Sequence, residues 1–239
     1  MSELWLRSYV RSGLRVATSA LLVMACGPLV ASASAQPPPA ANARVGRVIG
    51  YTCLGCHGIV GYRNAYPNYA VPRLRGQHVQ YLIDALKEYR SGARAYPTMH
   101  LQALSLSAQQ IADVATYLAG KPAVGTKPVA LSQVPKAARL CASCHGSDGI
   151  GVSPMYPTLA GQHESYLIRA LREYQTGYRK NPIMNAMAAS LTPGEIRTVA
   201  AYFSHLRPGL HTVPRPYFSW TAKPLHLQEQ RFIGDGNAR

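Results

Sequence analysis

Two short stretches decide how this chain folds: Cys53-Leu54-Gly55-Cys56-His57 and its second copy, Cys141-Ala142-Ser143-Cys144-His145. On a helix, positions i, i+3 and i+4 share one face, so the two cysteines and the histidine of each stretch should point the same way. This pattern suits a c-type haem, because two thiols attach to one edge of the macrocycle and the adjacent imidazole reaches the iron. The sequence therefore predicts two covalently bound haem c groups, with Cys53, Cys56, Cys141 and Cys144 as attachment sites and His57 and His145 as axial iron ligands.

Other roles for paired cysteines fit this chain less well. A zinc ribbon places its two pairs roughly 15–20 residues apart, whereas a whole repeat unit separates Cys56 from Cys141. A thioredoxin-like redox pair needs a βαβ pattern, and the chain has no convincing strand-type alternation. Simple disulfides would give no reason for a histidine after each pair.

The two stretches belong to a longer internal repeat. The segment Pro72–His78 (PRLRGQH) recurs as Pro157–His163 (PTLAGQH), and the first copy carries three extra residues between His57 and Pro72. Loop-like Gly and Pro residues separate the halves. The predicted organisation is a signal peptide at 1–35, a flexible mature N-terminus at 36–42, a first domain at 43–120, a linker at 121–135, a second domain at 136–207 and a C-terminal extension at 208–239.

Both halves are expected to be helical. Apolar residues recur at helical spacing over 79–89 and 166–174. A later helix in each half begins with a capping box, Ser107 with Gln110 and Thr192 with Glu195. The fold class predicted is all-α. Each half is small, so its own side chains supply only a marginal core, and a bound group should fill it.

The repeat also indicates the second axial ligand. Methionine is a soft ligand that raises the potential of haem iron, and Met99 aligns with Met184. Met187 has no methionine counterpart, so we expect it to fill core. His100 is the rival ligand in the first half and would give a much lower potential, but the second copy has Asn185 there.

These residues resemble the class I diheme cytochromes c, specifically the cytochrome c4-type group, over about 43–207. The resemblance implies two tandem cytochrome c-like helical domains, each enclosing one covalent haem between a histidine and a methionine. It also implies that the carbonyls of Pro72 and Pro157 accept a hydrogen bond from the ligand histidines and so orient them. The insertion after His57 and the extension 208–239 depart from the family pattern.

Several other residues are less specific. Arg94 and Arg179 either bind haem propionates or lie on a solvated basic surface. His78 and His163 open helices and are not expected to be ligands. Aromatic residues of the extension are expected to attach it to the body of the protein: Tyr217, Phe218, Trp220 and Phe232.

The N-terminus predicts export to the periplasm. Three arginines precede an apolar run over 16–30, and Ala33-Ser34-Ala35 offers small residues at a signal-peptidase site. Cleavage after Ala35 would leave a mature form with no integral membrane span. Two alternatives remain, an uncleaved anchor and lipidation of Cys26.

Composition narrows the function classes. Apolar residues at 47% and charged residues at 15% exclude a disordered chain, and a mean hydropathy of −0.07 excludes a multi-span membrane protein. The net charge of +15 favours docking to acidic surfaces of redox proteins, such as a membrane oxidase, reductase or dehydrogenase. Nucleic acid is not expected as a partner of an exported chain without a recognition motif.

An iron with histidine and methionine on its two faces has no vacant position for a substrate. We therefore expect an electron carrier in a respiratory or related redox chain and not an enzyme. Three alternatives stay open: an electron-transfer subunit of a dehydrogenase complex, which the extension 208–239 could serve, a diheme peroxidase, and a haem-based sensor.

Overall fold

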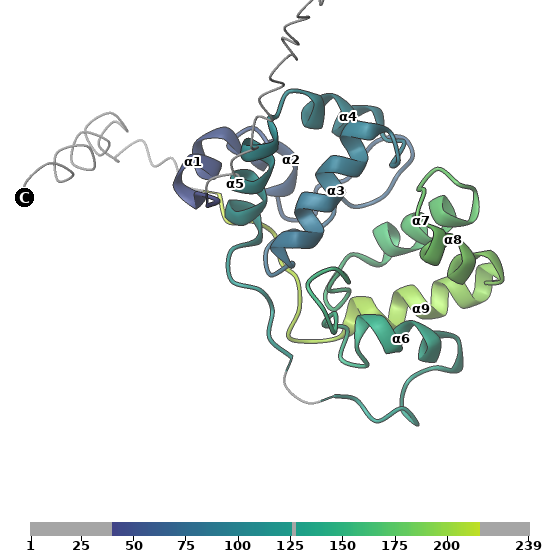
Figure 1. The fold of residues 1–239 in the computed structure, drawn as a ribbon. Helices are drawn as coiled ribbons and strands as arrows, with labels where there is room; N and C mark the ends of the chain where they lie inside the picture. Colours follow the sequence, from purple (N-terminus) through teal and green to yellow (C-terminus); the bar gives the residue numbers. More distant parts are fainter. Residues whose placement is uncertain (1–39, 126–127, 216–239) are drawn as a thin grey trace, which may run out of the picture. The chain divides into compact units, whose positions relative to one another are not determined.

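The computed structural model describes residues 40–125 and 128–215, and this part of the chain forms helices joined by loops (Figure 1). The first half contains α1 (Ala43–Ile49), α2 (Leu54–His57), α3 (Val79–Ser91), α4 (Pro97–Leu104) and α5 (Ala108–Ala119). The second half contains a short 3-10 helix, η1 (Lys136–Ala138), and then α6 (Arg139–His145), α7 (Glu164–Gln175), α8 (Pro182–Ala189) and α9 (Pro193–His205). The described residues form isolated β-bridges but no strand. The all-α prediction is confirmed.

The internal repeat of the sequence is a repeat of helices. α3, α4 and α5 of the first half correspond to α7, α8 and α9 of the second. Both capping boxes are present: Ser107 accepts from the backbone of Gln110, and Thr192 from that of Glu195. These caps satisfy N–H groups that a helix start otherwise leaves without partners, so they fix where α5 and α9 begin.

Each half has its own apolar core. In the first half, Leu54, Leu82, Val114 and Leu118 are buried together where α5 meets α2 and α3. α1 also crosses α5 closely, because Gly46 lies against the backbone of Asp113 and a Cβ there would collide with it. In the second half the core lies between η1, α6, α7 and α9, with the residues Val134, Ala138, Ala142, Leu167, Val199, Ala200 and Phe203.

The chain after α9 returns to the first half, which the sequence did not indicate. His211 and Arg75 exchange backbone hydrogen bonds of 3.0 and 3.1 Å. Val213 is fully buried in the core of the first half, and its N–H donates to the carbonyl of His57 at 3.3 Å. We call residues 208–215 the return segment; its path is visible in yellow in Figure 1. The aromatic residues expected to attach the extension lie beyond it, outside the described residues.

Backbone pairing joins the two halves between α3–α4 and α7–α8. The N–H of Ala95 donates to the carbonyl of Tyr178 at 3.0 Å, and the N–H of Lys180 donates to that of Ala93 at 2.8 Å. The guanidinium of Arg169 lies 4.7 Å from the ring centroid of Tyr69. The two backbone bonds are equivalent through the repeat, because Ala95 corresponds to Lys180 and Ala93 to Tyr178.

None of the helices within 40–125 and 128–215 has the length and apolar character needed to cross a membrane. The predicted signal peptide at 1–35 and Cys26 lie outside the described residues.

Candidate functional site: a cavity between two thiols and a methionine

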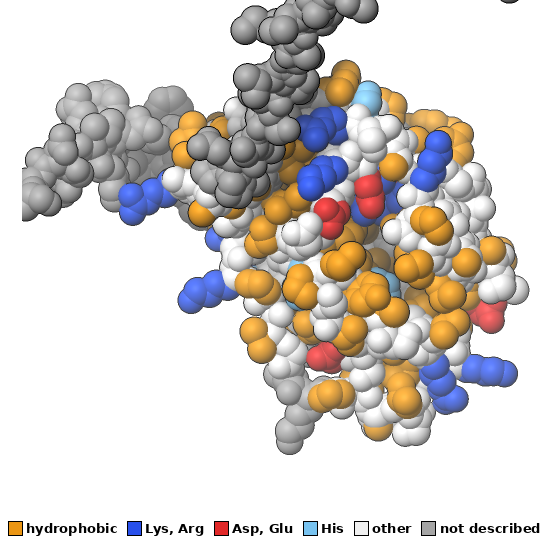
Figure 2. Space-filling model, in the orientation of Figure 1, with side chains coloured by type: hydrophobic (Ala, Val, Ile, Leu, Met, Phe, Trp, Pro, Cys, Tyr) orange, Lys and Arg blue, Asp and Glu red, His pale blue; other side chains and the backbone are white. Residues whose placement is uncertain are grey.

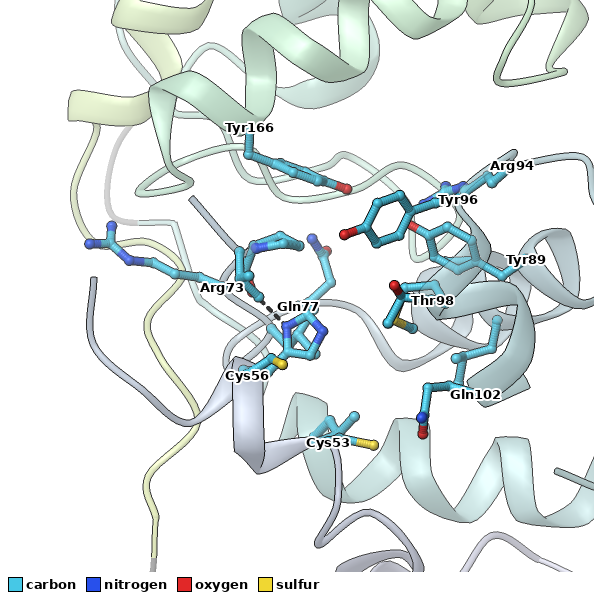
Figure 3. A pocket seen from close by; sticks show the side chains of 18 of the residues that line it. Cys53, Cys56, Arg73, Gln77, Tyr89, Arg94, Tyr96, Thr98, Gln102 and Tyr166 are labelled. Atoms are coloured by element: carbon cyan, nitrogen blue, oxygen red, sulfur yellow. Dashed lines mark hydrogen bonds between the residues drawn. The ribbon is translucent and has the colours of Figure 1, made fainter. Parts of the chain in front are cut away.

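The first Cys-x-x-Cys-His stretch forms one tight helical turn. Cys53 precedes α2 with helical dihedral angles (φ −61°, ψ −30°), and Cys56 and His57 lie within α2. Both cysteines are free thiols, and burial raises the pKa of Cys53, so this thiol is neutral at pH 7. Figure 3 shows Cys53 and Cys56 on neighbouring positions at the edge of a cavity.

The imidazole of His57 is held from behind by the backbone. Its Nδ1–H donates to the carbonyl of Pro72 at 2.9 Å, the bond drawn as a dashed line in Figure 3. Burial lowers the pKa of His57, and the bond to Pro72 opposes that shift. The ring is therefore a neutral imidazole that offers Nε2 as its ligating nitrogen, which is the form that binds metals.

A cavity of about 360 Å³ opens next to this histidine. Cys53, Cys56 and His57 line one side of it, and Met99 of α4 is among the residues that line the rest. Figure 3 shows Thr98 and Gln102 of the same helix facing the cavity across from the cysteines. The volume lies within the usual range of about 300–1,000 Å³ for sites that bind small molecules and cofactors.

Met99 and His100 have different surroundings. Met99 lines the cavity, whereas the Nδ1–H of His100 donates to the carbonyl of Tyr89 at 2.7 Å. The residue equivalent to His100 in the second half, Asn185, donates to the carbonyl of Tyr174 at 2.5 Å. His100 and Asn185 thus both tie a short helix to the preceding long one, and this shared structural role supports Met99 as the iron ligand.

The second half repeats the donor arrangement. Cys141, Cys144 and His145 lie within α6, and both cysteines are free thiols. The Nδ1–H of His145 donates to the carbonyl of Pro157 at 3.0 Å. Burial lowers the pKa of this histidine and the bond to Pro157 opposes the shift, as in the first half.

The two methionines of α8 differ in burial. Met184 is half-buried at the position equivalent to Met99, and its N–H is capped by the side chain of Asn181. Met187 has an exposed fraction of 40%, so the expectation that it fills the core is wrong.

Arg94 and Arg179 are buried, so a solvated basic surface is the wrong interpretation for both. The Nε of Arg94 bonds Glu88 at 2.5 Å, and the Nε of Arg179 bonds Glu173 at 2.6 Å. Each guanidinium also lies over two tyrosine rings, for Arg94 those of Tyr81 and Tyr89. Both arginines line the cavity, so propionate binding stays a prediction.

Part of the cavity lining comes from the second half of the chain. Thr158, Gln162 and Tyr166 belong to the second half and line a cavity whose thiols belong to the first. Figure 3 shows the Tyr166 ring over the same space as Tyr96. Sequence reasoning missed these residues, although the repeated Gly-Gln-His of each half pointed to one of them.

A c-type haem fits these residues. Such a group requires three kinds of donor, and all three are present: paired free thiols on one helical turn, an imidazole whose Nδ1–H is already hydrogen-bonded, and a thioether that lines the same cavity. The second half offers the same donor types at equivalent positions.

Comparisons with known proteins agree with this donor set. The family model for cytochrome c matches residues 46–121 and again 136–207. Cytochrome c-552 of Acidithiobacillus ferridurans is 35% identical over 209 residues, which cover 79% of this chain and 85% of that protein. The thiosulfate dehydrogenase electron acceptor of Thiomonas intermedia is 31% identical over 212 residues, covering 82% and 91%. The structure of Acidithiobacillus ferrooxidans cytochrome c4 matches with a TM-score of 0.53 at 33% identity, covering 66% of this chain and 99% of that one.

Proposed function

The chain belongs to the cytochrome c family as a diheme electron carrier with two covalent haem c groups, and on this premise we propose which residues hold them and which proteins it serves. Cys53 and Cys56 attach the first haem, and Cys141 and Cys144 attach the second. His57 and Met99 ligate one iron, and His145 and Met184 ligate the other. The single observation that carries this proposal is the cavity lined together by Cys53, Cys56, His57 and Met99.

Haem iron supplies one-electron chemistry by cycling between its ferric and ferrous states. The residues of this chain keep that chemistry confined to electron transfer. The carbonyls of Pro72 and Pro157 fix the orientation of each histidine ring and increase its basicity. With Met99 and Met184 as second ligands, each iron would have no position left for oxygen or peroxide, which supports a carrier over a peroxidase or a sensor.

The donor of electrons is proposed to be a dehydrogenase that acts in the periplasm. The relative from Thiomonas intermedia is named as the electron acceptor of thiosulfate dehydrogenase, and it matches this chain over most of both lengths. Periplasmic location rests on the predicted signal peptide at 1–35. A membrane oxidase or reductase is the corresponding acceptor.

Charge and surface character support docking to acidic patches. The full chain has 25 Lys and Arg against 10 Asp and Glu. Figure 2 shows one face on which apolar side chains occupy much of the middle and Lys and Arg stand around the edge. An apolar centre with a charged rim is the usual anatomy of a docking surface, and the rim controls how fast the partners meet.

The ligand assignment is tested by spectroscopy of the purified holoprotein. The near-infrared charge-transfer band of methionine-ligated ferric haem should correspond to two sites per chain, and carbon monoxide should not bind the reduced protein. Met99→Ala should halve the band, and Met187→Ala should leave it intact. A full-strength band in Met99→Ala would reject Met99 as a ligand.

The partner assignment is tested by reduction kinetics. A thiosulfate-oxidising dehydrogenase should reduce the carrier at a rate that falls as ionic strength rises, because salt screens attraction between exposed charges. A rate that does not change with salt would contradict docking on acidic patches, and no reduction at all would contradict the proposed donor.

A second candidate is a permanent subunit of a dehydrogenase. The cytochrome subunit of sulfide dehydrogenase from Chlorobaculum tepidum is 38% identical to this chain over 88 residues. Purification from the native membrane or periplasmic fraction distinguishes the two cases. A stable complex that survives high salt would favour the subunit, and a lone carrier would favour the shuttle.

A further inference from the structure

Two buried glutamines, Gln77 and Gln162, reach from one half of the protein into the other. They occupy equivalent positions in the repeated Gly-Gln-His, and their exposed fractions are 3% and 5%. Neither belongs to the predicted ligand set. Each side-chain oxygen accepts one bond within its own half, from the N–H of His78 at 2.9 Å or of His163 at 3.0 Å. The other bonds of both buried amides go to the opposite half, and buried polar groups that reach across a boundary need an explanation.

Each glutamine makes the same pair of bonds across the boundary. Gln162 accepts from the N–H of Arg73 at 2.9 Å and donates to the carbonyl of Arg73 at 3.0 Å. Gln77 accepts from the N–H of Thr158 at 2.9 Å and donates to the carbonyl of Thr158 at 3.0 Å. The side-chain amide of each glutamine therefore bonds both the N–H and the carbonyl of one residue in the other half. We call each such pair of bonds a clamp.

The clamped residues directly follow the two prolines behind the ligand histidines. The N–H of Arg73 and the carbonyl of Pro72 are parts of one peptide group, and that carbonyl accepts from the Nδ1–H of His57. The N–H of Thr158 is linked in the same way through the carbonyl of Pro157 to His145. In each case a continuous chain of two hydrogen bonds runs from a glutamine of one half to an imidazole of the other.

Hydrogen bonds in such chains polarise one another. A peptide group whose N–H is donating carries more negative charge on its oxygen, by a cooperative effect of roughly 10–30% per bond. The proline carbonyl is then a stronger hydrogen-bond acceptor for the imidazole N–H. The imidazole in turn becomes a stronger electron-pair donor to the metal that its Nε2 ligates. A more basic axial histidine stabilises ferric iron and lowers the potential.

We propose that Gln162 and Gln77 are crossed positioning residues: Gln162 tunes the haem held by His57, and Gln77 tunes the haem held by His145. This inference rests on the proposed histidine ligands. The potential of each haem then depends on the presence of the other half of the protein, so neither half alone would give its haem the same potential.

The two clamps are not identical. The Arg73 side chain also donates to the carbonyl of Gly161, next to Gln162, whereas the hydroxyl of Thr158 is buried without a hydrogen-bond partner within the described residues. The clamp on the first half thus has an additional anchor, and the clamp on the second half relies on Gln77 alone. Loss of Gln77 should therefore have the larger effect of the two.

The test replaces each glutamine by methionine, which keeps the length of the side chain. The change removes both hydrogen bonds to the opposite half and the one from the following histidine N–H. In the holoprotein, Gln162→Met should raise the midpoint potential of the first haem and leave the second unchanged. Gln77→Met should do the reverse, with the larger shift. The Nδ1–H resonance of the ligand histidine in the affected half should move upfield, since its hydrogen bond becomes weaker, and NOEs from Tyr156, whose ring centroid is 6.4 Å from that of His145, assign the second haem.

The two variants are matched controls for each other, because each removes two hydrogen bonds between the halves. Ser165→Ala is a further control that removes the bond from the N–H of Ala70 to the Ser165 hydroxyl, at 3.0 Å, without touching either clamp. Three results would overturn the proposal: a midpoint potential that shifts only for the haem on the glutamine's own half, one that shifts equally for both haems in both variants, or one that shifts in neither variant. So would a Ser165→Ala shift as large as those of the glutamine variants. If the wild-type spectrum lacks two histidine-ligated haems, the ligand assignment fails instead, and this is visible before any variant is made.

Discussion

Replacing Glu173 by glutamine should destabilise the protein by about 3 kcal/mol, because it leaves a buried guanidinium without a carboxylate. Glu173 bonds Arg179 at 2.6 Å and Arg169 at 2.7 Å, and its side chain is 13% exposed. Breaking a fully buried pair by removal of one partner costs about 3–5 kcal/mol, and partial access of water places this case at the lower end. Glutamine preserves the shape of the side chain and one acceptor oxygen, so the loss of unfolding free energy measures the contribution of the Glu173 charge.

The first half supplies the matched comparison. Glu88 bonds Arg94 in the equivalent place, but its side chain is 29% exposed, and within the described residues no second arginine forms an ion pair with it. Each arginine has two tyrosine rings beneath it, so the ring contribution cancels between the halves. Glu88→Gln should therefore cost less, about 2 kcal/mol, because solvent screens a more exposed charge.

The assay is guanidinium denaturation of the holoprotein followed by circular dichroism, with amide hydrogen exchange to locate the loss in α3 or α7. Glu164→Gln is the charge control: Glu164 lies in the first turn of α7 and forms no ion pair within residues 40–125 and 128–215, so the change should cost less than about 1 kcal/mol. A loss below about 0.5 kcal/mol for Glu173→Gln would refute the reasoning. It would mean that another anion, such as a haem propionate, already compensates Arg179. A larger cost for Glu88→Gln than for Glu173→Gln would refute the burial argument.

Three further predictions concern packing and pH. Val213→Ala should lower the free energy of unfolding by about 2 kcal/mol, since it removes two buried methyl groups and leaves a small cavity, and the first half should show the loss in hydrogen exchange. Gly46→Ala should separate α1 from α5, because the new Cβ meets the backbone of Asp113; thermal unfolding would show it, and an unchanged Tm would contradict the close approach. Burial, together with Arg73 and Arg63, lowers the pKa of His163 from 6.5 to about 4, so its stabilising contribution is complete above pH 6.5 and is lost as the pH falls toward 4. His163→Gln should flatten that part of the stability–pH curve, and an unchanged slope would reject the assignment.

Much of the fold was predictable because short sequence patterns indicate the helices and the repeat. The two Cys-x-x-Cys-His stretches, the repeat and the capping boxes at Ser107 and Thr192 are signals that act within a few residues. The family models and the helices of the structure agree with the two-module, all-α prediction.

What the sequence did not reveal depends on contacts between distant segments. Nothing in Gly-Gln-His says that Gln77 bonds a residue of the other half, because periodicity gives the face of a helix and not its neighbour. Arginines are usually exposed, so the burial of Arg94 and Arg179 follows only from the carboxylates and rings that surround them. The return segment is too short and irregular to have a periodic signal of its own.

The return segment also sets an order of events during synthesis. A ribosome makes the chain from its N-terminus, so the whole second half is built before Val213 exists to complete the core around α2. Until then the turn that carries Cys53 and Cys56 lacks one of its packing partners, together with the amide that bonds the His57 carbonyl. The earlier-made module can therefore complete its packing only once the chain as far as Val213 is present, and the surroundings of its thiols are looser until then.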